Sequence, residues 1–413
     1  MSRVLFTVAF ALAILVSVSL HEAGHMLTAK RFGMKVTQYF VGFGPTLWSF
    51  RRGETEYGVK GIPLGGFCKI VGMTPQDDDV APGDEKRVMW RYPVWKRTIV
   101  MSAGSITHFM LAIVGLWIGA AFIGLPNLNY PSTPAERAAQ PAAIVLGQCV
   151  PPNPAATACA PTDPVAPAKA AGLRDGDVLT AINGVPIANF GEMQRVIRQT
   201  TPGPAEIAYT RDGVAGTVRA DLAAVQRAPL DNPTGPATTV SALGVGQRIT
   251  VPTEVTFGAV GAFGATVEYS GWMVTQTFDA FKRIPSKVPA LWRSITGDER
   301  DPETPISVVG ASLIGGEAAS LGLWSAVLML FVGLNVFIGI FNLLPLLPLD
   351  GGHIAIAWFE RARSWVYARR GRPDPGRVDY FKLMPLTYAV ILIGGAFTLL
   401  TLTADIINPI TIK

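Results

Sequence analysis

Four long apolar segments constrain the fold of this 413-residue chain more than any other feature. Each reaches or approaches the roughly 20 residues that a helix needs to cross a bilayer. A mean hydropathy of +0.33 and a charged fraction of only 16% are also typical of membrane proteins. We therefore expect four transmembrane helices, with the lipid bilayer and not a nucleic acid as a partner. The apolar segments are Val4 to about Leu27, Ile99 to Leu125, Leu323 to about Leu347, and Leu383 to about Ile407.

Basic residues are concentrated in two of the connecting segments. Twelve lie between Ala29 and Thr98 and seven between Ile354 and Lys382, whereas the tails outside the apolar segments carry only Arg3 and Lys413. The positive-inside rule then places both basic segments in the cytosol and both termini outside a cell membrane. The long segment between the second and third helices is expected outside as well. A cleaved signal peptide is the alternative for the first helix, but the basic residues on its far flank outnumber Arg3, which favours an uncleaved helix.

The first apolar segment ends in the motif His21-Glu22-Ala23-Gly24-His25. Two histidines four residues apart lie on one face of a helix, where both can bind one zinc ion while the glutamate between them activates a water molecule. The alternative is a pair of helix-face histidines with a surface glutamate. Ionisable groups at the end of an apolar helix are costly unless they are functional, which favours the zinc site.

A catalytic zinc site needs a third protein ligand and one open position for water. We expect Asp350 to be that ligand, because it follows the third apolar segment. The first and third helices both run from outside to inside, so Asp350 reaches the same depth as His21 and His25, near the cytosolic face. Pro345, Pro348, Gly351 and Gly352 should break the helix around Asp350, as a wet cavity at membrane depth requires. A solvated aspartate in a cytosolic turn is the alternative.

The two remaining histidines, His108 and His353, are weaker candidates. His108 lies in the second apolar segment, where it is either a helix-packing residue or a partner of the metal site. His353 follows Asp350 by three residues, so it is either an outer partner of the site or an interfacial residue.

Short strand-like pieces punctuated by glycine follow the first helix and predict hairpins near the membrane. They are Thr37–Val41, Thr46–Arg51, Thr55–Lys60 and Phe67–Val71.

The outer segment begins with a Pro- and Ala-rich stretch, residues 131–168, that contains Cys149 and Cys159. An oxidising compartment favours a disulfide between them, and two free thiols are the alternative. Residues 168–187 then predict a turn, an apolar strand and a tight Asn-Gly hairpin. Residues 257–295 have an amphipathic pattern that fits either surface helices or a second soluble domain.

Taken together, these motifs resemble the site-2 protease family of intramembrane zinc metalloproteases, and most closely the regulator-of-sigma-E protease group in its actinobacterial form. The resemblance extends over nearly the whole chain. It departs from the family pattern at Ser105 and His108, where the family usually has Pro and Asn, and at Pro348, which stands one place late. The matching motifs are His21 to His25, Phe43-Gly44-Pro45, Gly58–Met73, Ala103-Gly104, and the run from Asn342 to His353.

The resemblance implies one Zn²⁺ per chain, bound by His21, His25 and Asp350, with Glu22 as the general base. Asn342 and Pro345 would contact the substrate. The loop that contains Gly65, Gly66 and Phe67 would pair with the substrate as an added strand. Residues 168–187 would be the core of a PDZ domain that screens substrates.

The expected fold is a polytopic α-helical membrane protein with four transmembrane helices, a membrane-associated β-hairpin region and an inserted α+β PDZ domain. Its expected substrates are transmembrane segments of single-span proteins, such as anti-sigma factors already cut by an upstream site-1-type protease. Clearance of remnant signal peptides and a non-proteolytic zinc-binding scaffold or transporter are the alternatives. The expected divisions are 1–30, first helix; 31–98, β region; 99–125, second helix; 126–228, PDZ-like domain; 229–322, amphipathic helices; 323–353, third helix; 354–382, basic loop; and 383–413, fourth helix and tail.

Overall fold

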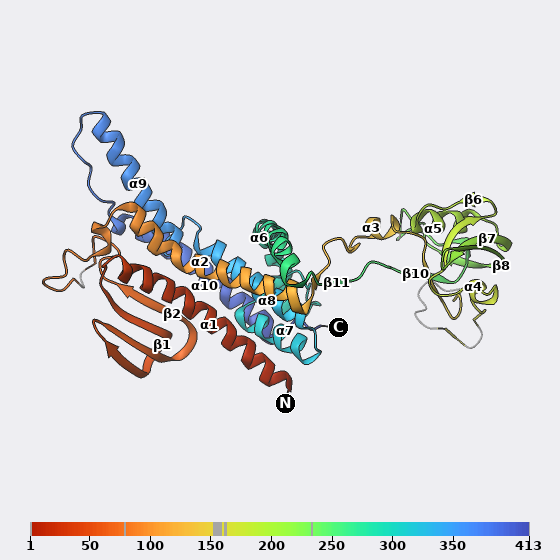
Figure 1. The fold of residues 1–413 in the computed structure, drawn as a ribbon, viewed down its shortest axis with the longest axis horizontal. Helices are drawn as coiled ribbons and strands as arrows, with labels where there is room; N and C mark the ends of the chain where they lie inside the picture. Colours follow the sequence, from red (N-terminus) through yellow and green to blue (C-terminus); the bar gives the residue numbers. More distant parts are fainter. Residues whose placement is uncertain (1, 78–79, 152–158, 161–162, 233, 413) are drawn as a thin grey trace. The chain divides into compact units, whose positions relative to one another are not determined.

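The computed structural model describes residues 2–77, 80–151, 159–160, 163–232 and 234–412. The chain forms two compact units (Figure 1). Unit one combines Met1–Leu125 with Thr256–Lys413, and unit two is Pro126–Val255. The two-residue strands β3 (Leu125–Pro126) and β11 (Glu254–Val255) stand where the chain passes between the units.

Unit one contains the four helices that are long and apolar enough to cross a membrane within the described residues, as predicted. They are α1 (Ser2–Arg31), α2 (Val94–Ile118) with its wider continuation η2 (Gly119–Ile123), α8 (Trp324–Asn342), and α10 (Met384–Ile407) after the short turn η3 (Tyr380–Leu383). The second helix begins five residues earlier than predicted, because a polar first turn that contains Lys96 and Arg97 follows Pro93 and precedes the apolar run.

The third membrane helix ends at Asn342, so the predicted range of 323–353 is too long. Residues 343–349 are not helical, and Asp350 begins a separate helix, α9 (Asp350–Arg369). The predicted basic loop of 354–382 is therefore largely helical. From His353 onward the sequence has no Gly or Pro until Gly371, and it is rich in Ala and Arg, which are strong helix formers.

The segment 229–322 does not form one kind of structure. Its first part belongs to unit two, which extends to Val255 and not to residue 228. Its second part forms α6 (Gly258–Thr296) and α7 (Val308–Ser320) in unit one, where α6 packs against α2, α8 and α10. Val260, Phe263 and Val267 leave an exposed apolar stripe on α6, as expected for an amphipathic helix in contact with lipid.

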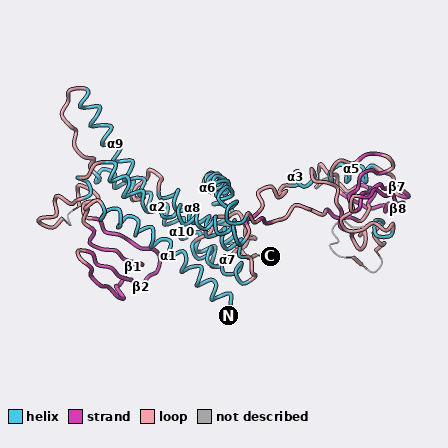
Figure 2. Tube along the Cα trace, viewed as in Figure 1, coloured by secondary structure: helices cyan, strands magenta, loops and turns pink. Residues whose placement is uncertain are grey.

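The strand pieces after α1 join into two long strands, β1 (Val36–Arg52) and β2 (Thr55–Ile70), as Figure 2 shows. Both strands bend, so that several residues of β1 each have two partners in β2. Tyr39, for example, lies opposite both Tyr57 and Cys68. Gly42 and Gly44 allow the bend in β1, because both have φ angles above +80° that side chains disfavour. The result is a small sheet whose outer segment, residues 66–70, lies along α1.

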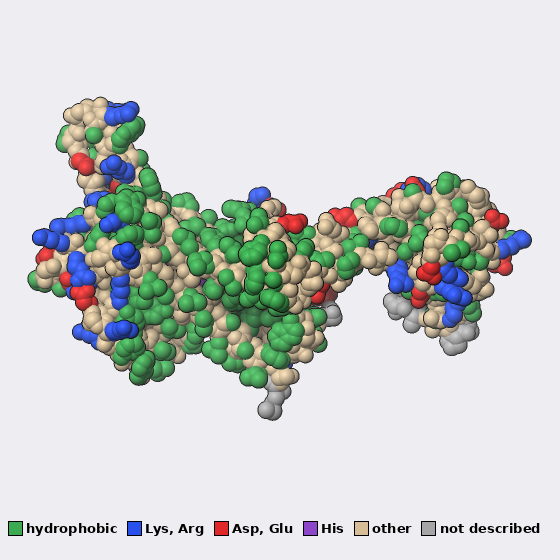
Figure 3. Space-filling view, viewed as in Figure 1, with side chains coloured by type: hydrophobic (Ala, Val, Ile, Leu, Met, Phe, Trp, Pro, Cys, Tyr) green, Lys and Arg blue, Asp and Glu red, His purple; other side chains and the backbone are tan. Residues whose placement is uncertain are grey.

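Both ends of the chain meet at one carboxylate of α7. The Arg3 guanidinium lies 3.3 Å from Glu317 Oε2, and the backbone N–H of Ile412 donates to the same oxygen at 3.3 Å. The termini therefore lie at the same end of unit one (Figure 1). Lys and Arg side chains gather at the opposite end, around the base of α9 and the β1–β2 sheet, and hydrophobic side chains cover much of the surface between (Figure 3).

Unit two contains a five-stranded sheet in the order β6-β5-β7-β8-β9, packed against helix α5. The predicted Asn183-Gly184 hairpin joins β5 to β6, with positive φ angles of 47° and 76°. Cys149 and Cys159 form a disulfide next to this core. The remaining elements are the short helices α3 (Pro134–Ala138) and α4 (Pro167–Ala170) and the strand pair β4–β10. The bounds are β4 Ile144–Leu146, β5 Val178–Ile182, β6 Val185–Pro186, α5 Phe190–Gln199, β7 Gly203–Arg211, β8 Val214–Arg227, β9 Thr238–Ala242 and β10 Val245–Gln247.

Candidate metal centre

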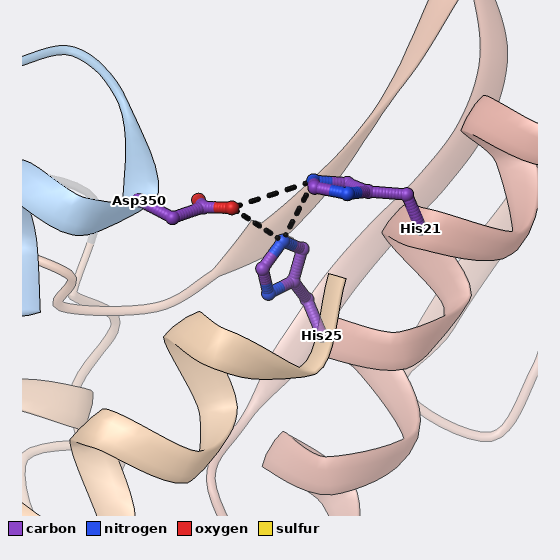
Figure 4. A group of neighbouring side chains, drawn as sticks. All are labelled: His21, His25 and Asp350. Atoms are coloured by element: carbon purple, nitrogen blue, oxygen red, sulfur yellow. Dashed lines mark hydrogen bonds and ion pairs between the residues drawn. The ribbon is translucent and has the colours of Figure 1, made fainter. Parts of the chain in front are cut away.

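Three side chains from distant parts of the sequence converge inside unit one (Figure 4). His21 and His25 extend from one face of α1, and Asp350 extends toward them from the first turn of α9. Their Nε2 atoms lie 3.1 Å apart, and Asp350 Oδ2 lies 3.4 Å from His21 Nε2 and 3.3 Å from His25 Nε2. The two histidines are 6% and 5% exposed, so the cluster is nearly closed to bulk solvent.

A backbone hydrogen bond determines which ring nitrogen of His25 carries the proton. Its Nδ1 lies 2.7 Å from the carbonyl oxygen of Val100 in α2, so this nitrogen carries the proton and donates it. In the neutral ring Nε2 then presents a lone pair toward His21 and Asp350. A histidine oriented through its other nitrogen in this way is the usual arrangement of a metal ligand.

The cluster fits a divalent cation better than a set of mutual hydrogen bonds. Asp350 Oδ2 and His21 Nδ1 are both buried without a hydrogen-bond partner among the described residues. Lone pairs that converge in a buried site repel one another unless a cation lies between them. Tetrahedral zinc with bonds of about 2.0–2.2 Å separates its ligand atoms by roughly 3.3–3.6 Å. The three separations in the cluster are close to these values, and two nitrogens with one carboxylate oxygen suit zinc.

Close packing of α1 against α2 depends on two glycines. A Cβ on Gly104 would lie 2.4 Å from His21 Cε1 and 2.5 Å from His25 Nε2, so only a glycine leaves room for both rings. A Cβ on Gly24 would lie 2.7 Å from the carbonyl oxygen of Ala103. These glycines let the two helices approach closely enough for α2 to form one wall of the cluster.

The turn between α8 and α9 positions Asp350. A Cβ on Gly351 would lie 2.2 Å from the carbonyl oxygen of Leu343, and a Cβ on Gly352 would lie 2.7 Å from the backbone of Leu346. The glycines therefore allow α9 to start directly beneath the end of α8. Asp350 stands in the first turn of α9, where the helix dipole favours its negative charge.

Glu22 lies between the cluster of His21, His25 and Asp350 and the edge of the β1–β2 sheet. It is close enough to His25, His21 and Asp350 for electrostatic interaction with each. On its other side, a Cβ on Gly66 would lie 3.4 Å from Glu22 Cγ. Gly66 pairs with Val41 of β1, and its other side has no strand partner among the residues that the structure describes. A carboxylate thus faces an open strand edge beside the cluster.

The other predicted site residues are placed less directly. Gly65 adopts a φ of +135°, and Phe67 stacks on Phe40 at a ring-centre distance of 5.6 Å, so both shape the strand edge. Asn342 is half-buried at the end of α8, and Pro345 is exposed in the turn after it. Neither makes a hydrogen bond to His21, His25 or Asp350 in the described part of the chain.

His108 and His353 have different surroundings. His353 stacks on Tyr380 at a ring-centre distance of 5.9 Å and lies on the side of α9 that faces η3. His108 is fully buried in α2, and its ring centre lies 5.0 Å from that of His21. His108 therefore contacts a residue of the cluster, whereas the ring of His353 contacts Tyr380.

Residues that sequence reasoning did not identify also contribute to the site. Val100 supplies a carbonyl to His25, and a backbone acceptor has no signature in the sequence. Ser17 and Asn335 form hydrogen bonds around His108. Ser17 could have been found, because it stands four residues before His21 on the same helix face.

Comparison with known proteins finds similar metalloproteases. The family model of peptidase family M50 matches residues 9–379. The chain is 44% identical to the zinc metalloprotease Rip1 of Mycobacterium tuberculosis over 98% of its own length and 97% of the relative. It is 42% identical to the Rip1 protein of Mycolicibacterium smegmatis over 98% of each chain. A putative zinc metalloprotease of Nostoc is 26% identical over 96% of this chain and 95% of the relative.

Proposed function

The chain belongs to peptidase family M50, the site-2 protease family of zinc metalloproteases, and we propose that it cleaves peptide bonds within membrane-embedded segments at the cluster of His21, His25 and Asp350. The single observation that supports this site is the convergence of three buried ligand atoms, with separations that suit tetrahedral zinc, next to Glu22. We assign one zinc ion per chain to these three ligands.

The roles of the residues follow from their positions. When bound, zinc polarises the scissile carbonyl and lowers the pKa of a coordinated water. Glu22 takes a proton from the attacking water and delivers it to the leaving nitrogen. His21 and His25 hold their positions through the helix face and the Val100 carbonyl. Burial of the cluster excludes bulk water and strengthens each of these electrostatic interactions.

The open edge at Gly65, Gly66 and Phe67 binds the substrate as an added strand. A transmembrane helix hides its carbonyls in internal hydrogen bonds, so it must unwind before a peptide bond can be attacked. Backbone groups of β2 can pair with the unwound segment and hold it extended. The distance of 3.4 Å between a Cβ on Gly66 and Glu22 Cγ supports this role, because it places the edge next to the general base. Asn342 and Pro345 contact the substrate from the α8 side.

The proposed orientation places both termini outside the cell and the metal centre near the cytosolic face of the cell membrane. The common position of the termini at Glu317 supports an even number of crossings. The gathering of Lys and Arg at the opposite end supports the cytosolic assignment for that end.

Unit two acts as a PDZ-like filter outside the membrane. A cavity of about 350 Å³ lies between α5 and β9, lined by Phe190, Met193, Ile197 and Val240, and a groove between a helix and a strand suits an extended peptide. Cys149 also lines this cavity, so the disulfide holds one of its walls. Substrates with bulky outer domains would be excluded.

The proposed substrates are single-span proteins, most plausibly anti-sigma factors that an upstream site-1-type protease has already shortened. Clearance of remnant signal peptides is the alternative within the same chemistry. A zinc transporter would need ionisable groups along the bilayer depth. Within the described residues, the clustered metal ligands lie at one depth only, which favours the protease.

The test compares purified wild-type protein with Glu22→Gln, His21→Ala and Asp350→Ala. Wild-type protein should hold about one zinc per chain, as three protein ligands imply. Glu22→Gln should keep the zinc and lose cleavage, whereas the other two variants should lose both. Membrane proteomes of cells with wild-type and Glu22→Gln enzyme should then reveal substrates as fragments that accumulate with the variant. Full cleavage by the Glu22→Gln protein would rule out the mechanism.

A further inference from the structure

Two buried nitrogens beside the metal-binding cluster lack partners. They are His21 Nδ1 and His108 Nε2, which make no hydrogen bond to any described residue. Their rings belong to α1 and α2, with centres 5.0 Å apart and planes tilted by 44°. An unpaired polar atom inside a protein is destabilising, so two such atoms in adjacent rings indicate a missing partner.

The hydrogen bonds on the far side of His108 determine which kind of atom its Nε2 is. Asn335 in α8 donates from Nδ2 to the carbonyl oxygen of Phe331 at 2.9 Å, which fixes the orientation of its amide. Its Oδ1 then faces His108 Nδ1 at 2.8 Å and accepts a hydrogen bond from Ser17 Oγ at 2.5 Å. His108 Nδ1 must therefore carry the proton. In the neutral ring Nε2 is left as a hydrogen-bond acceptor.

In His21 the unpaired nitrogen is expected to be a donor and not an acceptor. If its Nε2 binds a metal, as the proposed function requires, the proton of the neutral ring lies on Nδ1, which becomes a hydrogen-bond donor. A buried donor on one ring and a buried acceptor on the other thus belong to two rings whose centres are 5.0 Å apart. His25 has the same need for an outer acceptor, and the Val100 carbonyl meets it.

We infer that His108 is the outer partner of His21, accepting a hydrogen bond from His21 Nδ1–H through one buried water. Asn335 and Ser17 hold His108 in the tautomer that this role needs. We call Ser17, His108 and Asn335 the relay. They come from α1, α2 and α8, and each side chain is at most 2% exposed. His108 is a positioning residue that acts on the metal through His21. This inference rests on the proposed metal centre and adds to it a set of residues that determine its affinity.

The test measures zinc retention against a chelator, and the visible spectrum of the cobalt-loaded protein, in full-length detergent-purified variants. His108→Phe keeps a ring of similar size without the acceptor. It should lower zinc affinity about 10–100-fold and change the cobalt absorption bands. His108→Gln can still donate to Asn335 and accept from His21, so it should restore most of the affinity. Ser105→Ala is the matched control, because Ser105 is fully buried on the same helix and should leave both measurements unchanged.

Asn335→Leu tests the relay with both histidine rings in place. It should weaken zinc binding in the same direction as His108→Phe. The double variant should bind zinc no more weakly than His108→Phe alone, since Asn335 acts through His108. Unchanged affinity and spectrum in His108→Phe, or additive losses in the double variant, would overturn the inference while leaving the metal centre intact. A wild-type protein that holds no more zinc than His21→Ala would instead overturn the metal centre itself.

Discussion

Gly104 lies so close to His21 that a Cβ atom on this glycine would fall 2.4 Å from His21 Cε1. The close approach of α1 and α2 at this point leaves room for two imidazoles and nothing larger than hydrogen on α2. The geometry of the proposed metal centre therefore depends on Gly104, which is not itself a ligand.

Gly104→Ala should lower zinc affinity by about tenfold or more, because the new methyl group pushes both histidines away from Asp350. The measurement is zinc content after dialysis against a weak chelator. Gly394→Ala is the matched control, since a Cβ on this glycine of α10 meets no atom within 4 Å. Equal zinc retention in the two variants would show that α1 and α2 can move apart without weakening zinc binding.

Gly66→Val should lower the cleavage rate by roughly 100-fold while zinc content stays the same. Valine favours strands, but its side chain would meet the carbonyl oxygen of Phe40 and the side chain of Glu22 at the edge where the substrate is proposed to pair. Gly61→Val provides the comparison in the same strand, because a Cβ there has only ordinary contacts at 3.6 Å or more. A Gly66→Val enzyme as active as Gly61→Val would exclude strand pairing at this edge.

Acid should destabilise unit two through Asp177. Burial alone would raise the pKa of this carboxyl, but hydrogen bonds from Arg211 and from the backbone N–H of Arg174 outweigh burial and hold its pKa below the usual value. The ion pair therefore stabilises the folded unit above the unfolded pKa of about 3.9, and this stability is lost as pH falls through the lower folded pKa.

Hydrogen exchange of the full-length protein measures this effect. Protection of β5 and β7 should decrease below about pH 4 in the wild type. Asp177→Asn should show weaker protection already at pH 7, with little further acid dependence from this site. Identical pH profiles for the two proteins would show that the pair contributes nothing to stability.

Non-reduced protein should contain one free thiol, that of Cys68. Burial raises the pKa of the Cys68 thiol strongly, so it should react with an alkylating reagent only after unfolding. The Cys149–Cys159 disulfide should stabilise unit two by about 2–3 kcal/mol. Differential alkylation with mass spectrometry checks the pairing. Alkylation of Cys149 and Cys159 without reductant would contradict both the disulfide and the proposed outer location of unit two.

The sequence was informative where chemistry and spacing coincide. The four-residue spacing of His21 and His25 placed both on one helix face, and the common direction of two membrane helices brought Asp350 to the same depth. Neither step required a tertiary contact to be known, which is why the cluster of three ligand atoms could be anticipated.

Other features depend on contacts that leave no local signal. Asn335 lies 227 residues from His108, and no periodicity in either segment connects them. The sequence predicts a basic loop where α9 forms, because basic residues indicate a cytosolic location but do not by themselves distinguish a helix from a loop. Four short strands were expected where two long ones occur, because Gly42 and Gly44 bend β1 without ending it.

Glu317 receives both the first turn of the chain, through Arg3, and its last residues, through Ile412. The first and last described segments of unit one are thus held together through a single side chain. Two halves of a split fluorescent reporter, one fused to each end, would lie close enough to assemble only when unit one is folded. The two ends could also be joined by a short linker and the chain opened in another loop, giving a circularly permuted enzyme.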